Sequence, residues 1–322
     1  MPSASAFVLE QRAQQARHFA TLDVADAVRE NAPWRLRPDH WSLNLAPSIR
    51  DRALSYFATH GIVWHLQADH GLSSQIACVN FLMPLATRPT LLARLVGRAL
   101  GLDAPEMLPI EVGPSGVPWY VGFEWTARAD HLGEWPSSGA PTRGAHVTSA
   151  DAIVRFRHSG LVETVLIEWK YTESYGGPLN PRGHDTRVAR YEGRAFAPSG
   201  PIRADRGLKV ADFFWEPFYQ MLRQQMLAGR MEATREDGAD RVRVLHLSPQ
   251  GNRDLRRVTA PALRALATDA FDAFRTALQP PSDGVPRFSC LATETAFAPL
   301  LKDQAGEAWA DHLTARYGFL GL

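Results

Sequence analysis

The sequence predicts a mixed α/β fold, in which a small antiparallel sheet is followed by a helix and a further strand, with helices added at both ends. Two observations support this prediction. Residues 149–173 hold two β-branched, apolar stretches on either side of Ser159-Gly160, a pattern typical of a β-hairpin. Helical periodicity fills most of the first hundred residues and returns after residue 209.

The N-terminal third is expected to be mostly helical, because apolar residues recur there at helical spacing. The expected helices cover 4–30, 47–60 and 72–100. Pro84 and Pro89 should interrupt the third helix, since proline cannot donate the hydrogen bond that a helix interior requires. The short segment GIVWHLQ, residues 61–67, has the β-branched and aromatic composition of a strand.

The rest of the chain is expected to complete the sheet and cover it. Further strands are predicted at 117–127 and 240–249, and further helices at 209–232, 261–278 and 302–316. Residues 174–208 are rich in glycine, proline and arginine without clear periodicity, which predicts a long loop of a kind that often serves function. The expected organisation is a helical N-terminal extension at 1–70, a core at 71–250 and a helical C-terminal extension at 251–322.

The composition limits the classes of function. A hydrophobic fraction of 45% in 322 residues supports a sizeable core, and a net charge of +1 means that nucleic-acid contact needs a local basic patch. Cys78 and Cys290 lie far apart, which excludes a structural zinc site built from thiolates. The chain does not open on a secretory signal, and its longest apolar run, 76–86, is too short to span a membrane, so we expect a cytoplasmic protein without membrane contact.

Motifs of several other enzyme classes are absent from the sequence. It contains no P-loop, no GxGxxG fingerprint, no GxSxG elbow and no HExxH zinc motif, so ATP-driven translocation is not expected. His60, His65 and His70 recur every five residues, which does not match one face of a helix. Structural roles, or a DNA contact by His65, explain them better than a zinc site does.

The predicted hairpin brings three polar side chains to one end of its strands. The two-residue turn makes Asp151 face Glu168, and Lys170 shares the side of Glu168. Only three of the 35 basic residues are lysine, so this lysine suggests chemistry that needs an ammonium group. Two facing carboxylates would repel unless they share a divalent cation, and Mg²⁺ prefers such oxygens. A lysine beside the metal can orient or deprotonate a water and stabilise charge on an attacked phosphate.

A structural ion pair between Glu168 and Lys170 at a strand end is the alternative to a metal site. The metal-site interpretation also depends on the turn, because a one-residue change of register would separate Asp151 from Glu168.

Asp151, the turn and the run VLIEWK resemble the signature of the PD-(D/E)XK nuclease superfamily. More narrowly, TSADAIVRFR and VLIEWKYTESY resemble a restriction-endonuclease-like bacterial family within it, and the likeness extends to the stretches HGIVWHLQADHGLSSQIACVNFL and EPFYQMLRQQMLA. One departure is that the first half of the signature reads SAD, without the usual proline. The resemblance implies a core of a helix, three antiparallel strands, a helix and a fourth strand.

By this resemblance, Asp151 and Glu168 would bind Mg²⁺, for which Mn²⁺ could substitute, and the backbone carbonyl of Trp169 would complete the site. Lys170 would assist the attacking water. The implied activity is that of an endonuclease hydrolysing DNA, in restriction or defence. Many such nucleases act as dimers, so a homodimer stays open. A catalytically silent nucleic-acid-binding protein of the same fold and a nuclease acting on RNA are the alternatives.

Residues near the hairpin in sequence are candidates for supporting roles. Glu134 lies in a glycine-, serine- and proline-rich loop that leads toward Asp151, and it is preferred as an additional acidic ligand. A solvated loop glutamate is the alternative, and Glu124 reads as a side chain that points off a strand. Arg143 is a candidate phosphate ligand.

Two further groups are candidates for contacting the nucleic acid. Between residues 180 and 194, arginines interleave with an aromatic residue, a composition that suits phosphate contact and base stacking. The candidates there are Arg182, Arg187 and Arg190, with a solvated loop as the alternative. The helix that follows offers polar groups for the substrate or the attacking water from Tyr219, Gln220, Arg223 and Gln224.

Overall fold

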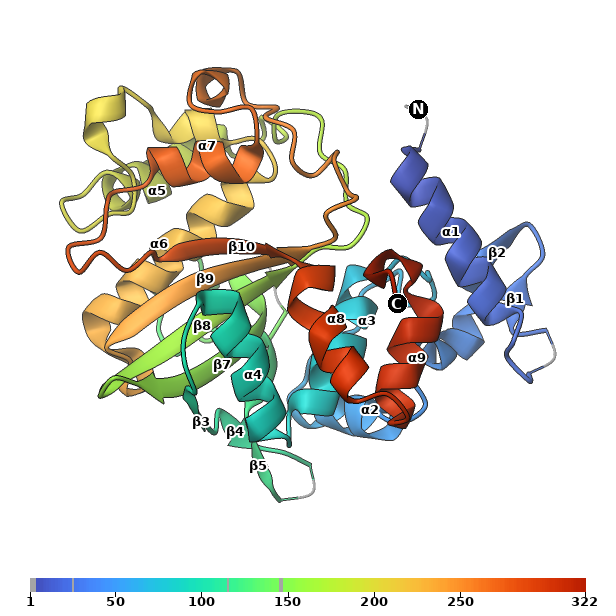
Figure 1. The fold of residues 1–322 in the computed structure, drawn as a ribbon. Coiled ribbons are helices and arrows are strands. Elements are labelled where there is room, and N and C mark those ends of the chain that lie inside the picture. Colours follow the sequence, from blue (N-terminus) through green and yellow to red (C-terminus); the bar gives the residue numbers. More distant parts are fainter. Residues whose placement is uncertain (1–3, 25, 115, 145–146) are drawn as a thin grey trace.

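The fold is built around a mixed β-sheet with helices on both of its faces (Figure 1). The computed structural model describes residues 4–24, 26–114, 116–144 and 147–322. The strands follow the order β10-β9-β8-β7-β3, with β6 also paired to β7. Their bounds are β3 (Glu106–Leu108), β6 (Val121–Thr126), β7 (Ser149–His158), β8 (Leu161–Trp169), β9 (Arg241–Ser248) and β10 (Phe288–Ala292). Beside this sheet, β4 (Glu111–Val112) pairs with β5 (Pro118–Trp119).

The predicted hairpin forms the centre of the sheet. β7 and β8 pair antiparallel with Ile153 opposite Leu166, as the predicted turn requires. Ser159 and Gly160 both have positive φ values, 50° and 81°, which suit a two-residue turn between twisted strands. β8, β9 and β10 run parallel, whereas β3 and β6 pair antiparallel with β7. The mixed α/β class is therefore confirmed.

Each face of the sheet has its own hydrophobic core. Val154, Val165 and Ile167 pack into the first core, so the apolar side of the hairpin is covered by helices. The helices on this side are α3 (Ser74–Leu82), α4 (Pro89–Leu100), α8 (Thr293–Asp303) and α9 (Ala308–Arg316). Ile153 and Leu166 belong to the second core, under α5 (His184–Ala195), α6 (Phe218–Thr234) and α7 (Ala270–Ala277).

The N-terminal segment differs from the long helix predicted over 4–30. α1 (Ala6–Phe19) ends early, and the chain then forms β1 (Val28–Arg29) and β2 (Ala32–Leu36), which pair antiparallel. Arg29 and Arg35 both form ion pairs with Asp69, at 2.6 and 2.9 Å. The prediction was wrong here because contacts with a carboxylate far along the chain favour the two strands, and sequence periodicity does not register such contacts.

The segment 61–67 is not the predicted strand. Trp64 stacks on Phe57 with ring centroids 3.7 Å apart, and the backbone N–H of His65 donates to Gln75 Oε1 at 2.8 Å. Side-chain contacts, rather than hydrogen bonds to a neighbouring strand, hold the backbone of this segment. Its β-branched composition therefore did not indicate a strand correctly. The helices around it match the prediction better, since α2 (Arg50–Thr59) precedes it and α3 and α4 form the expected broken pair.

Residues 174–208 contain a helix within the predicted loop. α5 buries Tyr191 and Ala195, and Val188 packs against the same core. These three residues recur at three- and four-residue spacing on an otherwise polar helix, which gives a narrow apolar stripe. The sequence did not predict this helix, because glycine, proline and arginine dominate the residues around the apolar stripe.

The helices after residue 209 are shorter than predicted. α6 starts at Phe218, after the 3-10 helix η4 (Val210–Phe213). The helix predicted over 261–278 is divided into η6 (Pro261–Ala265) and α7. The division occurs because Asp269 caps α7, accepting from the backbone N–H of Phe271 at 2.9 Å. The helix predicted over 302–316 corresponds to the end of α8 and to α9.

The two ends of the chain share a core with the sheet. Leu45 and Leu320 belong to the same buried cluster as Val154 of β7. The extensions expected at 1–70 and 251–322 therefore pack onto the central segment and onto each other.

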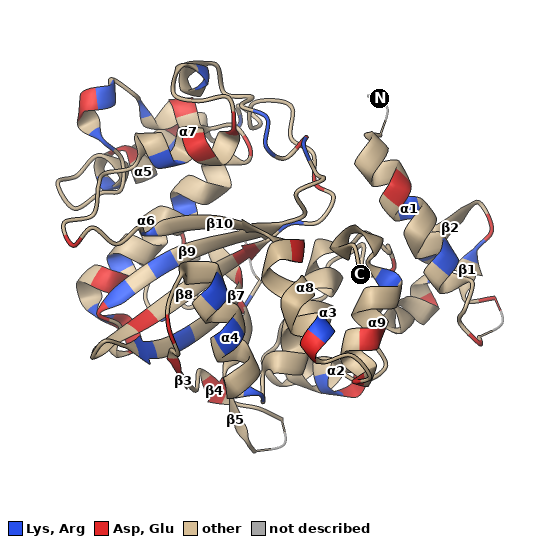
Figure 2. Cartoon of the chain, viewed as in Figure 1, with Lys and Arg blue, Asp and Glu red and all other residues tan. Residues whose placement is uncertain are grey.

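Charge is dispersed over the molecule. In Figure 2 basic and acidic residues are interspersed over the helices and the sheet, in line with the net charge of +1. Nucleic-acid contact would therefore depend on local groups of arginines. Among the described helices, none is long and apolar enough to cross a membrane.

Candidate active site

Two carboxylates lie opposite each other at the end of the central hairpin. The register of β7 and β8, in which Ala152 faces Ile167, makes Asp151 and Glu168 the next pair of neighbours. Asp151 Oδ2 accepts a hydrogen bond of 2.6 Å from the backbone N–H of Trp169, which holds the carboxylate against β8. The structure thus brings together the two acids that the hairpin register predicts as neighbours.

Glu168 is held between a lysine and a glutamine. The two charged residues are deeply buried, with 2% of Glu168 and 7% of Lys170 exposed. Lys170 Nζ forms an ion pair with Glu168 Oε1, and Gln224 Nε2 of α6 donates to Glu168 Oε2. The backbone N–H of Lys170 donates to Leu247 O of β9 at 2.9 Å. Neighbouring strands and α6 therefore fix the position of this pair.

Burial and mutual repulsion disfavour negative charge in this cluster. Burial, followed by the charge of Asp151, raises the pKa of Glu168 to about 8. Burial also raises the pKa of Asp151, although the Lys170 ammonium opposes the shift. Burial alone would lower the pKa of Lys170, but the charge of Glu168 outweighs it and raises that pKa well above its usual value. The acids would therefore gain from a further positive charge.

A third carboxylate, Glu124 of β6, faces Asp151. The register of β6 and β7, in which Phe123 pairs with Ala152, puts Glu124 opposite Asp151. Glu124 is 5% exposed, and burial together with the charge of Asp151 raises its pKa to about 7. The sequence did contain a signal for this residue, because pairing the predicted strand 117–127 with the hairpin would have placed it there.

Side chains from the N-terminal part of the chain hold Glu124. Gln75 Nε2 of α3 donates to Glu124 Oε1 at 2.7 Å, so the helix that lacks an acid contributes an amide. His65 Nε2 lies 3.7 Å from the same oxygen. Burial lowers the pKa of His65, which favours a neutral ring at this edge of the cluster.

Glu134, the acid preferred from sequence, lies in a different network. Its oxygens accept hydrogen bonds from Thr148 Oγ1 at 2.8 Å and from Tyr191 Oη at 2.5 Å. Arg223 Nε forms an ion pair with Glu134 at 3.2 Å. Burial would raise the pKa of Glu134, but Arg223 and the hydrogen bonds hold it below its usual value. The Glu134 carboxylate therefore joins a loop to α5 and α6. Glu124 occupies the position beside Asp151 that was expected for Glu134.

Two of the arginine candidates are already paired. Arg143 Nη2 forms an ion pair with Glu111 Oε2 at 2.8 Å, and its guanidinium lies 4.4 Å from the centroid of the Trp125 ring. Arg223 is held by Glu134 and lies over the Tyr219 ring, 5.2 Å from its centroid. Of the polar residues predicted on α6, Gln224 reaches the acid cluster directly. Among the described residues, the side chain of Gln220 forms no hydrogen bond with the acid cluster.

The arginines of the 180–194 segment are less constrained. In the part of the chain that the structure describes, no carboxylate forms an ion pair with Arg182, Arg187 or Arg190. Arg187 lies over the Phe214 ring, 5.5 Å from its centroid. Arg187 and Arg190 lie on α5 and Arg182 precedes it, and such guanidiniums are suited to phosphate contact.

Glu216 and Tyr175 add to the polar surroundings of Lys170, and sequence analysis named neither. Burial raises the pKa of Glu216, while the charge of Lys170 opposes that shift. Glu216 Oε2 is buried and has no hydrogen-bond partner among the described residues. Burial also raises the pKa of Tyr175 above its usual value. The lysine therefore lies among several groups able to accept its protons in hydrogen bonds.

The chemistry of the donor atoms decides which metal could bind here. Within the residues that the structure describes, no three His, Cys, Asp or Glu side chains form a ready set of metal ligands. The hairpin end instead offers the two carboxylates Asp151 and Glu168 and the carbonyl of Trp169. Mg²⁺ often binds through one or two carboxylates and keeps several waters, so these residues fit it. Burial raises the pKa of both carboxyl groups, and a divalent cation would favour their ionised forms.

The chain thus combines a mixed sheet with buried acids and a lysine at the ends of two adjacent strands. The family described as Restriction Endonuclease associating with ARP matches residues 9–318. The chain belongs to this family, which indicates a nuclease, and therefore a hydrolase, with DNA as substrate and a role in defence. No curated protein and no solved structure matches the chain.

Proposed function

We propose that the protein is a Mg²⁺-dependent endonuclease that hydrolyses phosphodiester bonds of DNA with a site of the PD-(D/E)XK kind. The observation that carries this proposal is the buried group of Asp151, Glu168 and Lys170 at the ends of β7 and β8. The order of α3, α4, β6, β7, β8, α5, α6 and β9 along the chain supports it, because it follows the core order that the resemblance implies. Mn²⁺ is proposed to substitute for Mg²⁺.

Asp151, Glu168 and the Trp169 carbonyl are the proposed metal ligands, and Glu124 is proposed as a further acid that acts through water or directly. When bound, Mg²⁺ would supply Lewis-acid stabilisation of the charge that develops on the attacked phosphate. Gln224 and Gln75 orient the two glutamates from opposite sides of the cluster. Such fixed partners keep carboxylates in a productive position without reorganisation.

The protonation state of Lys170 determines its proposed role. Its raised pKa keeps the side chain protonated at neutral pH, so it donates hydrogen bonds rather than accepting a proton. We propose that Lys170 orients the attacking water and stabilises a phosphate oxygen through this ammonium. Arg182, which precedes α5, and Arg187 and Arg190 on α5 are the proposed contacts to the DNA backbone, since no ion pair with a described carboxylate engages them.

Cleavage of supercoiled plasmid with Mg²⁺, with Mn²⁺ and with EDTA tests the proposal. Lys170→Ala should lower the cleavage rate at least about 100-fold, because it removes the donor that positions the water. Lys302→Ala is the matched control, since this lysine is exposed on α8, away from the hairpin. Equal cleavage by native chain and Lys170→Ala, or cleavage that persists in EDTA, would contradict the proposed site.

The ion pair between Lys170 and Glu168 also fits the alternative of a catalytically silent nucleic-acid-binding protein. Three further arms separate the alternatives: Mg²⁺ titration of the native chain, DNA binding without cleavage, and an RNA substrate of matched sequence. DNA binding with no cleavage of either substrate favours the silent protein, and preferential cleavage of RNA favours a ribonuclease. A homodimer is proposed only for double-strand cleavage, and sedimentation velocity with and without DNA tests it.

A further inference from the structure

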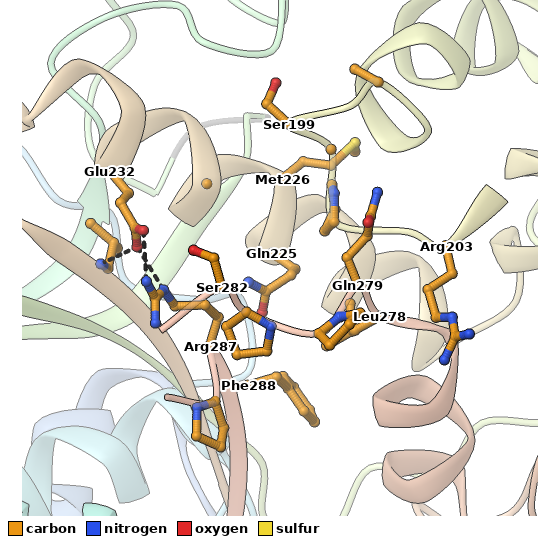
Figure 3. A pocket seen from close by; sticks show the side chains of 18 of the residues that line it. Ser199, Arg203, Gln225, Met226, Glu232, Leu278, Gln279, Ser282, Arg287 and Phe288 are labelled. Atoms are coloured by element: carbon orange, nitrogen blue, oxygen red, sulfur yellow. Dashed lines mark hydrogen bonds and ion pairs between the residues drawn. The ribbon is translucent and has the colours of Figure 1, made fainter. Parts of the chain in front are cut away.

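A cavity of about 910 Å³ lies beside α6 (Figure 3). Its walls come from the end of α5, the segment 197–206, α6, the end of α7 and the segment 280–288. None of Asp151, Glu168 and Lys170 lines it. Clefts of about 300–1,000 Å³ are typical of small-ligand sites, so the volume is sufficient for a ligand larger than a simple ion.

Arginine is the commonest charged residue around this cavity, and carboxylates pair with three of the arginines, Arg203, Arg275 and Arg287. Six guanidiniums line it, from Arg194, Arg203, Arg206, Arg230, Arg275 and Arg287. The one carboxylate in the lining, Glu232, accepts from Arg287 Nε at 2.8 Å (Figure 3). Arg206 and Arg230 are exposed and form no ion pair with any carboxylate in the described ranges. These two guanidiniums are therefore available to an anionic group.

A buried amide oxygen in the cavity lacks a partner. Gln225 is 4% exposed, lines the cavity and is seen among its labelled side chains in Figure 3. Gln225 Oε1 has no hydrogen-bond partner among the described residues. Burying an acceptor without a partner is unfavourable, so a ligand that donates a hydrogen bond there would be favoured. A bare anion would not satisfy this oxygen as well, because its oxygens act mainly as acceptors.

Two helical glycines keep the cavity open. Gly193 in α5 and Gly229 in α6 both line it, and a Cβ added at either position would meet no atom within 4 Å. Glycine within a helix is less favourable than alanine. No close contact inside the protein requires glycine at these two positions. The absence of a side chain there leaves space in the cavity for a ligand. Met226, Leu278 and Phe288 provide apolar surface beneath that space.

We infer that this cavity binds a nucleotide, either free or as the terminal unit of a strand, with its phosphate at Arg206 and Arg230 and its base at Gln225. The arginines match a phosphate, and the apolar floor matches a base. The exocyclic amino group of adenine, cytosine or guanine supplies the donor that Gln225 Oε1 lacks. Binding does not require cleavage, so the inference is independent of the proposed catalysis.

Isothermal titration calorimetry in EDTA, with the full chain carrying Lys170→Ala, tests the inference without turnover. The probes are deoxyadenosine 5′-monophosphate, deoxyadenosine, inorganic phosphate and a 5′-phosphorylated tetradeoxyadenylate. The monophosphate should bind at least tenfold more tightly than deoxyadenosine or inorganic phosphate. A tetranucleotide that binds at least tenfold more tightly than the monophosphate identifies a strand end as the ligand, and comparable affinity identifies a free nucleotide.

Variants then locate the binding. The double variant Arg206→Gln/Arg230→Gln should weaken monophosphate binding at least tenfold, and Gly229→Leu should abolish it by filling the cavity. Arg98→Gln, an exposed arginine on α4, is the matched control and should bind as the parent does. Circular dichroism and thermal unfolding establish that each variant is folded, and the double variant serves as the test if Gly229→Leu unfolds. No binding of the monophosphate at millimolar concentration, equal binding of inorganic phosphate, or binding that survives in the folded variants would overturn the inference.

Discussion

Glu124 combines two unfavourable features in one residue. Its φ of 47° lies in the left-handed region, which is uncommon for a residue other than glycine within a strand. Its carboxylate is also buried beside that of Asp151. Strained backbone and buried like charges persist where the surrounding structure imposes them, and they concentrate at functional sites. The stability of the metal-free protein should therefore depend on the protonation of this side chain.

We predict that Glu124→Gln removes a pH-dependent loss of stability. Because the pKa of Glu124 rises from its ordinary value of 4.5 to about 7, the folded state binds a proton that the unfolded state has released. The contribution of this group to the unfolding free energy should thus fall by up to about 3 kcal/mol as pH rises from 4.5 to 7, and then level off. Urea unfolding in EDTA between pH 5 and 8 measures it.

Glu10→Gln provides the control for this prediction, since Glu10 is an exposed acid on α1. Its pH profile should run parallel to that of the native chain. A Glu124→Gln profile that is also parallel would show that this carboxylate is ionised throughout the range. Added Mg²⁺ should stabilise the native chain more at pH 8 than at pH 6, because cation binding requires ionised acids.

At the residue scale, sequence reasoning was strongest where chemistry and local geometry coincide. The two-residue turn was sufficient to place Asp151, Glu168 and Lys170 together. It could not place Glu134, whose partners Tyr191 and Arg223 lie 57 and 89 residues further along the chain. Glu134 is close to Asp151 in the sequence. The tertiary fold nevertheless places its carboxylate with Tyr191 and Arg223, away from Asp151.

At the scale of elements, a buried ion pair joins β8 to β9 at the end of the hairpin remote from the acids. Glu163 is fully buried, and Arg243 Nη2 lies 2.7 Å from its Oε2. Arg241 forms a second ion pair with Glu163. The sequence showed Glu163 as an exception on an apolar face, and the parallel neighbour β9 supplies the charges that make this exception stable.

We predict that Glu163→Ala lowers the unfolding free energy by about 3–5 kcal/mol, because it leaves the buried Arg243 without a carboxylate partner, whereas Arg241 keeps Asp283. Urea unfolding at pH 7 measures the change. Glu106→Ala is the matched control, since Glu106 pairs with Arg157 at 3.1 Å on an exposed edge and should change stability by about 1 kcal/mol at most. Similar losses in both variants would show that the buried pair has no special weight.

Helices and strands could be predicted where the periodicity of apolar residues determines them. They could not be predicted where tertiary side-chain contacts fix the backbone. The hairpin and the broken α3–α4 pair follow from alternation and from proline. The segment 61–67 does not, because Trp64 on Phe57 and the Gln75 bond to the backbone fix a non-strand conformation. α5 was missed for the opposite reason, since its three apolar contacts are sparse among polar residues.

At the scale of the whole molecule, a buried arginine links the first helix to the last. Arg316 of α9 is fully buried. Its Nε donates to Gln15 Oε1 of α1 at 2.9 Å, and its Nη1 donates to Asn44 O at 2.5 Å. In the described ranges no carboxylate pairs with it. Neutral amide and carbonyl oxygens alone therefore satisfy this guanidinium.

We predict that Arg316→Met loosens α1 before it affects the sheet. The substitution leaves Gln15 Oε1 and Asn44 Oδ1 buried without the donors that Arg316 supplies, so it should cost at least about 2 kcal/mol. Hydrogen exchange should show a loss of amide protection in α1 that exceeds any loss in β7 and β8. Arg17→Met, at an exposed position of α1, should leave exchange unchanged. Uniform loss across the molecule would mean that α1 and the sheet open as one unit.

The order of the strands and the packing of distant elements were less predictable from the sequence than the individual residues and elements. The class of fold follows from the order of elements, but the strand order β10-β9-β8-β7-β3 depends on which strands find each other. Nothing in the local pattern of residues 288–292 indicated that β10 would extend the sheet beside β9. The packing of α1 on α9 likewise rests on contacts between residues at opposite ends of the sequence.

This last contact also sets an order of events during synthesis. Gln15 and its partner Arg316 are separated by 301 residues, which a ribosome adding about 5–20 residues per second needs roughly 15–60 s to produce. The strands that carry Asp151 and Glu168 emerge in the middle of that interval. A nascent chain can therefore assemble the acid cluster while α1 still lacks its partner, and the docking of α1 becomes the closing step of maturation.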